Sequence, residues 1–61
     1  MKPENCKVGV RVRVKGTVTE GFIVSTVNSI LYPDIICVNV MQDDGVELEY
    51  YNTDLKKVKV K

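Results

Sequence analysis

The chain has 61 residues and a formal net charge of +1, with 44% apolar and 28% charged residues. This length predicts a single domain, residues 1–61, which buries only about 60% of its unfolded surface and has little room for a deep pocket beside a core. The near-neutral charge excludes a whole-chain argument for polyanion binding. Because no apolar run approaches the roughly 18 residues of a membrane span, and none resembles a signal peptide, we expect a cytoplasmic protein without a membrane partner.

The residues that most often carry enzyme chemistry are scarce. The chain contains no histidine and two cysteines, Cys6 and Cys37. Without histidine, neither a Ser-His nor a Cys-His nucleophile can form, and two distant cysteines do not make a set of metal ligands. A cytoplasmic setting favours free thiols over a disulfide. We therefore expect no catalytic residue, no metal and no cofactor.

A period of two predicts β-strands in the first half of the chain. Residues 8–15 alternate valine with glycine, arginine and lysine, which gives one apolar and one basic face, and Gly16 ends the run. Residues 17–27 form a second β-rich run, in which Gly21 predicts a bulge or a sharp bend. Residues 1–6 are expected to be a loose segment ahead of the first strand.

Turn-forming residues separate three further predicted strands. A loop over residues 28–34 follows from its Asn, Ser, Pro and Asp, and a tight turn over residues 43–45 from Asp-Asp-Gly, because Asp-Gly readily takes positive φ. Residues 52–55 break the alternation and suit a single 3₁₀ turn. The three strands are expected over residues 35–41, 46–51 and 56–61. Their expected inward-facing residues are Ile36, Val38, Val40, Val46, Leu48, Tyr50, Val58 and Val60.

Five short strands with one helical turn before the last have the layout of an SH3-like small barrel. The Val-Gly-Val-Arg-Val-Arg-Val run at residues 8–14 resembles the opening strand of such domains. Their closing half is similar to Asp-Gly at residues 44–45, Tyr-Tyr at 50–51 and Asp-Leu-Lys-Lys-Val at 54–58. KOW and Tudor-type domains share this pattern. The resemblance covers nearly the whole chain and implies an all-β, five-stranded barrel, but it does not specify a function.

One enzyme family of this size, the plasmid-type (type II) dihydrofolate reductases, is similar in fold. Its tetramer builds a pore from a Val-Gln-Ile-Tyr strand. The corresponding segment here, read without gaps from Gly45, is Glu47-Leu48-Glu49-Tyr50. Leu48 occupies the glutamine position and Glu49 the isoleucine position, and glutamates would repel an anionic folate tail. The active-site motif is absent, and we expect no enzyme.

Cations gather on the first and last predicted strands, which are generally neighbours in an SH3-like barrel. Six cations would then share one face, and a polyanion would relieve the repulsion between like charges across the strands. The alternative is that lysines on edge strands only prevent aggregation. The residues predicted to bind nucleic acid are Arg11, Arg13, Lys15, Lys57, Lys59 and Lys61.

The loop between the second and third strands carries three consecutive apolar residues. They either cap the open end of the barrel or form a contact for a protein partner or a second copy of the chain. The residues predicted for this protein contact are Ile30, Leu31, Tyr32 and Tyr51. An aromatic cage for a methylated cation, built from Tyr32, Tyr51 and Glu49, is a further alternative.

Together these patterns predict a non-enzymatic binding module that contacts nucleic acid or a nucleoprotein complex through its basic face. The alternative is a protein-interaction or assembly subunit that uses the apolar loop, such as a phage-type accessory protein or a homo-oligomer. The identity of the partner and the oligomeric state stay open at this point.

Overall fold

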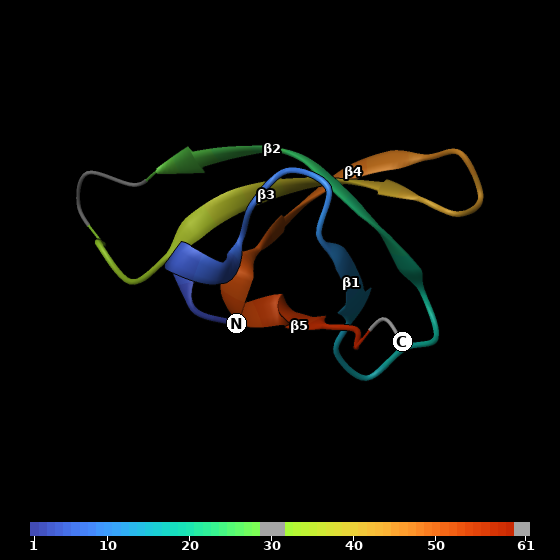
Figure 1. The fold of residues 1–61 in the computed structure, drawn as a ribbon, viewed down its shortest axis with the longest axis horizontal. Helices are drawn as coiled ribbons and strands as arrows, with labels where there is room; N and C mark the ends of the chain where they lie inside the picture. The colour runs from blue at the N-terminus through green and yellow to red at the C-terminus, as the bar shows by residue number, and fades with distance from the viewer. Residues whose placement is uncertain (29–31, 60–61) are drawn as a thin grey trace.

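Five antiparallel strands form one sheet in the order β4-β3-β2-β1-β5 in a computed structural model that describes residues 1–28 and 32–59 (Figure 1). The elements are η1 (Pro3–Asn5), β1 (Arg11–Val14), β2 (Glu20–Asn28), β3 (Ile36–Gln42), β4 (Glu47–Tyr51), η2 (Asn52–Asp54) and β5 (Leu55–Lys57). The predicted all-β class, the five strands and the 3₁₀ turn before the last strand are confirmed.

The expected closure of the sheet into a barrel is not found among the described residues. β4 and β5 lie at the two opposite edges of the sheet, and they do not pair with each other. Curvature comes from a register shift in β2 between Ile23 and Ser25, a β-bulge that lets this long strand bend. As a result, β2, β3 and β4 arch over the shorter pair β1 and β5 (Figure 1).

Gly21 does not form the predicted bulge, which lies further along β2, but meets a different requirement. It is buried, opposite Val12 on β1 and Gln42 on β3. A Cβ atom at this position would lie 2.8 Å from the Cα of Gln42 and 2.8 Å from Cγ1 of Val40. Glycine is therefore needed here because the neighbouring backbone approaches too closely for any side chain.

The first and last strands are shorter than predicted. Residues 7–10 form a turn, in which the backbone N–H of Val10 donates to the carbonyl of Lys7 (3.1 Å) and Gly9 takes a φ of +93°. Val8, assigned to the apolar face of the first strand, is therefore exposed. β5 begins one residue earlier than predicted and ends at Lys57.

The core lies on one side of the sheet and consists of alternate residues. Its buried apolar members are Cys6, Val12, Ile23, Ile36, Val38, Val40 and Leu55. The predicted inward phase of the third strand is confirmed. The fourth strand differs, because Val46 and Leu48 are 47% and 46% exposed. No described strand lies beyond β4 to cover them.

The N-terminal segment, expected to be loose, packs against the core. Cys6 is buried in the core cluster and Met1 lies against it. The buried side chain of Asn52, at the start of η2, holds this arrangement together. Its Nδ2 donates to the carbonyls of Met1 (2.7 Å) and Asp34 (3.1 Å), and its Oδ1 accepts from the N–H of Ile36 (2.8 Å). One amide thus joins three distant parts of the chain.

We predict that Asn52→Ala lowers the free energy of unfolding by about 3 kcal/mol, because it leaves a buried N–H and two carbonyls without their partner. Urea denaturation followed by circular dichroism measures the change. Thr53→Ala, at the exposed next position of η2, is the control and should change stability by less than about 0.5 kcal/mol. Equal urea midpoints for the two variants would contradict the role of Asn52.

Candidate functional site

The two basic strands predicted from the sequence, β1 and β5, do lie side by side. Val12 is opposite Lys57, and Arg13 is opposite Lys56. Directly opposite residues of an antiparallel pair share a face of the sheet. Lys56, rather than the predicted Lys57, therefore lies beside Arg13, and Lys57 is on the same side as the core residue Val12. The cations of β5 are distributed over both sides of the strand.

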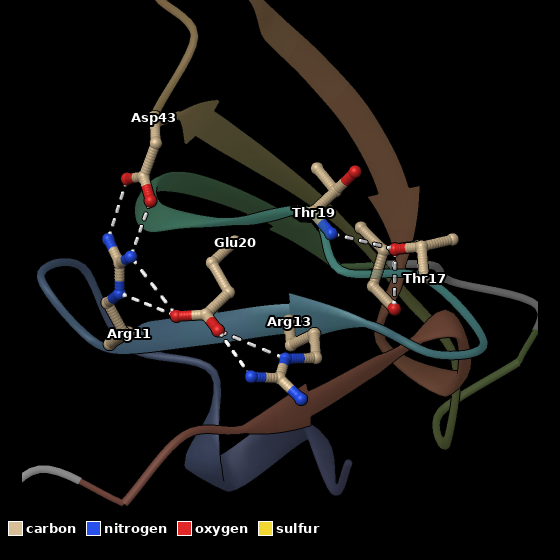
Figure 2. A network of polar contacts seen from close by, with 7 residues as sticks. Arg11, Arg13, Thr17, Thr19, Glu20 and Asp43 are labelled. Carbon is tan, nitrogen blue, oxygen red and sulfur yellow. Dashed lines mark hydrogen bonds and ion pairs between the residues drawn. The ribbon is translucent and has the colours of Figure 1, made fainter.

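Both arginines of β1 are bound by carboxylates (Figure 2). Arg13 lies opposite Glu20 on β2 and donates to its Oε2 from Nε (3.1 Å) and Nη2 (2.5 Å). Arg11 donates from Nε to Oε1 of Glu20 (3.2 Å). The terminal nitrogens of Arg11 also form a bidentate pair with Asp43 (2.7 and 2.5 Å). Two positive charges are therefore matched by two negative charges within one network.

Two turns position the members of this network. In the β1–β2 turn, the hydroxyl of Thr17 donates to the carbonyl of Val14 (2.8 Å) and accepts from the N–H of Thr19 (3.1 Å). This arrangement closes the hairpin that sets β1 against β2 (Figure 2). In the β3–β4 turn, the N–H of Asp43 donates to the carbonyl of Glu20 (3.0 Å). Gly45, at a φ of +88°, completes that turn as predicted.

An aromatic ring supports the network from the same face of the sheet. Phe22 is directly opposite Arg11 on the neighbouring strand. The guanidinium carbon of Arg11 lies 4.8 Å from the centroid of the Phe22 ring, which is within cation–π range. Two carboxylates and an aromatic ring thus bind the side chain of Arg11, and these intramolecular contacts hold it in place.

The hydrogen bonds from the arginines lower the pKa of both carboxyls. At Glu20 the bond from Arg13 is the largest cause, and the bond from Arg11 adds to it. At Asp43 the bond from Arg11 is the largest cause. The bond to Asp43 in turn raises the pKa of Arg11 above its ordinary value. Arg11, Glu20 and Asp43 are therefore charged at neutral pH.

We predict that stability falls in acid. A carboxyl whose pKa is lower in the folded than in the unfolded chain stabilises the fold above the unfolded pKa, about 4, and this contribution is lost as pH falls through the folded pKa. The free energy of unfolding, from urea titrations at a series of pH values, should be flat between about pH 7 and pH 5 and should then decline. Arg11→Gln should make the decline shallower, because it removes bonds to both carboxyls.

A matched control tests whether the effect belongs to the network. Lys7→Gln removes the same charge from an exposed side chain of the turn ahead of β1, and its pH profile should parallel that of the parent protein. If the Arg11→Gln profile also ran parallel to the parent, the network would not be the source of the acid sensitivity.

Because both arginines form ion pairs with carboxylates, lysines carry the positive charge of this region that is not paired in this network. Lys56, Lys57 and Lys59 follow one another along β5 and its continuation, and Lys15 follows β1; all four are exposed. None of them belongs to an ion pair in the described part of the chain. Lys61 lies outside the described residues. Two of the lysines border a shallow groove, which is lined by Gly9, Val10, Arg11, Lys57, Val58 and Lys59.

The opposite edge of the sheet is acidic. Glu47 and Glu49 on β4 are exposed, and they lie opposite Met41 and Asn39 of β3 on the outer face. Their alternation on one face is the one expected from the sequence. The sheet therefore has a basic edge at β5 and an acidic edge at β4.

The residues predicted for protein contact are only partly described. Ile30 and Leu31 lie outside the described residues. Tyr32, just ahead of β3, is 63% exposed, and Tyr51, at the end of β4, is 54% exposed.

Two neighbours of Tyr51 were not among the predicted contact residues. Cys37 lies directly opposite Tyr51, and Val27 lies directly opposite Cys37. Val27 is 57% exposed and Cys37 is half-buried. We call these three side chains, which cross β2, β3 and β4 on the outer face, the apolar row. The alternation within the second strand could have identified Val27, but the register that aligns the row is not readable from the sequence.

Other chemistry-bearing groups are few among residues 1–28 and 32–59. No group of three or more histidine, cysteine, aspartate or glutamate side chains in these ranges is placed to hold a metal ion. Cys6 and Cys37 are free thiols, and burial raises the pKa of Cys6. No helix in these ranges is both long enough and apolar enough to cross a membrane.

Comparison with known proteins gives no family for this chain. No protein-family model, no curated protein and no solved structure matches it.

Proposed function

We propose that this protein is a non-enzymatic binding module that contacts the phosphate backbone of nucleic acid, free or in a nucleoprotein complex, through the basic edge at β5. The observation that carries the proposal is the row of exposed lysines without ion-pair partners in the described structure, beside two arginines that are matched. Lysine and arginine contacts to phosphate supply the sequence-independent part of nucleic-acid binding.

The proposed binding residues differ from the set predicted from the sequence, because they leave out the two arginines. Arg11 and Arg13 would have to give up bonds to Glu20 and Asp43 before they could bind a phosphate. A lysine ammonium on a flexible stem makes such a contact without this loss. The proposed contact residues are Lys15, Lys56, Lys57 and Lys59. Because successive strand residues point to opposite sides, they present charge along the edge of the sheet and not on one face.

We also propose that this open sheet is related to the SH3-like fold. Two features support this: the strand order β4-β3-β2-β1-β5, and the 3₁₀ helix η2 between the last two strands. The bulge in β2 supplies the bend that such a fold needs in its longest strand.

We predict that the protein binds a short mixed-sequence single-stranded DNA, measured by fluorescence anisotropy, with an affinity that falls steeply as salt rises. About four phosphate contacts give a slope of about −3 for log affinity against log salt. The double variant Lys57→Glu with Lys59→Glu should lose at least about tenfold in affinity at low salt and should have a shallower slope.

A charge-matched control separates the β5 edge from net charge. Lys2→Glu with Lys7→Glu makes the same change at two exposed lysines ahead of β1, and this variant should bind nearly as well as the parent. Equal losses in the two double variants would assign the binding to net charge alone. An absence of binding at low salt would remove the proposal.

A second candidate function is protein–protein contact through the apolar row. The observation in its favour is the register, which aligns Val27, Cys37 and Tyr51 on three adjacent strands, with Val27 and Tyr51 more than half exposed. Exposed apolar side chains grouped in this way are typical of contact surfaces. Such a contact is expected to tolerate salt, unlike binding to phosphate.

For this second candidate we predict self-association at high protein concentration that persists in high salt, because burial of apolar area drives it. Sedimentation velocity measures it, and Tyr51→Ser should abolish it. Val18→Ser, at an exposed apolar residue between β1 and β2, is the control and should have no effect. A monomer at every concentration would exclude self-association through this row.

A further inference from the structure

The outer edge of β4 lacks a partner strand among the described residues. β4 pairs with β3 on one side, and no described segment pairs with its other side. The strand runs from the β3–β4 turn at one end of the molecule to η2 below the arch of the sheet (Figure 1). An edge of this kind presents main-chain N–H and C=O groups to which another strand can bind.

The two sides of β4 differ in chemistry. Glu47 and Glu49 project from the outer face, where they are exposed. Leu48 lies opposite the buried residue Val40, and thus on the core side, yet it is 46% exposed. Val46, just before the strand, is 47% exposed. The edge therefore alternates carboxylates with aliphatic side chains that the core covers only in part.

We propose that the free edge of β4 binds an extended segment of a partner protein in which lysine or arginine alternates with aliphatic residues. Main-chain hydrogen bonds would add the segment to the sheet as a further strand. Side chains directly opposite each other share a face, so the cations would lie against Glu47 and Glu49. The aliphatic residues would then cover Leu48 and remove its exposed area from water.

Charge complementarity favours this occupant over a second copy of the chain. Antiparallel pairing of β4 with β4 from another copy would bring glutamates together across the strands, which is destabilising. The basic strand β5 is a poor donor, because one side pairs with β1 and the N-terminal amine of Met1 already donates to the carbonyl of Leu55 (3.4 Å).

Protection against aggregation does not account for this edge. Charged side chains at an edge prevent unwanted strand pairing, and Glu47 and Glu49 would suffice for that purpose. Partly exposed aliphatic residues beside them work against protection, since they favour association. The combination fits a selective edge that rejects neutral and acidic strands and accepts a basic one. This inference does not depend on the nucleic-acid proposal, because β5 lies at the other edge of the sheet.

The test uses the full chain and a synthetic peptide of alternating lysine and valine, capped at both ends and long enough to span β4. We expect saturable binding by isothermal titration calorimetry and slower hydrogen exchange of β4 amides in nuclear magnetic resonance spectra. Two control peptides match it. One has N-methyl groups on alternate residues, which block edge hydrogen bonds but keep the charge, and the other has glutamate in place of lysine. Neither should bind.

Variants locate the site. Glu47→Gln with Glu49→Gln should weaken peptide binding about tenfold, because two cross-strand charge pairs are lost. The matched control, Glu4→Gln with Asp34→Asn, neutralises two exposed carboxylates that are not part of β4 and should bind normally. Both double variants should still bind single-stranded DNA at least as tightly as the parent does, so the two proposals can fail separately.

Three results would overturn the proposal. Equal binding of the N-methylated peptide would show electrostatic adhesion without strand pairing. Equal binding of the peptide by the Glu47→Gln, Glu49→Gln variant would place the peptide elsewhere. Self-association of the protein that is lost in this variant would identify a second copy, and not a basic partner segment, as the occupant of the edge.

Discussion

The carboxylate of Glu20 accepts hydrogen bonds from both arginines of β1, and the charge pattern of the surface depends on this sharing. Asp43 completes the match for Arg11 from the β3–β4 turn. Because these ion pairs neutralise the arginines, the lysines at the β5 edge supply the basic character of the region. The same bonds connect β1, β2 and the β3–β4 turn, so one network stabilises the sheet and also determines which cations of this region have ion-pair partners in the described structure.

The open sheet gives the molecule two edges with opposite chemistry. A closed barrel has no edges, whereas here β4 and β5 each have one side that no described strand covers. Lysines follow the β5 edge, while glutamates and partly exposed aliphatic residues follow the β4 edge. A chain this short has little room for a pocket beside its core. Edges are therefore the surfaces on which it can offer directional main-chain bonds as well as charge.

Alternation in the sequence predicted the strands and most of the core, because burial of one face requires a period of two. It could not predict contacts between residues distant in the chain. Arg11 and Asp43 are 32 positions apart, and only the register of three strands brings them together. The alternation of inward and outward residues in β5 is displaced by one residue from the predicted one. The reason is that buried Leu55 is the first residue of the strand and not the end of the turn before it. Asn52 looked like an ordinary turn residue, although its amide anchors the N-terminus.

The two proposed surfaces lie at different edges of the sheet, and the electrostatic coupling between them would have a definite sign. Glu47 and Glu49 contribute a negative potential that opposes the approach of a polyanion. A basic segment at the β4 edge would neutralise this potential and add positive charge, so it should favour nucleic acid at the β5 edge. Salt screens such a potential, over a Debye length of about 8 Å at physiological ionic strength. The coupling should therefore strengthen as salt is lowered, because screening and not contact controls it.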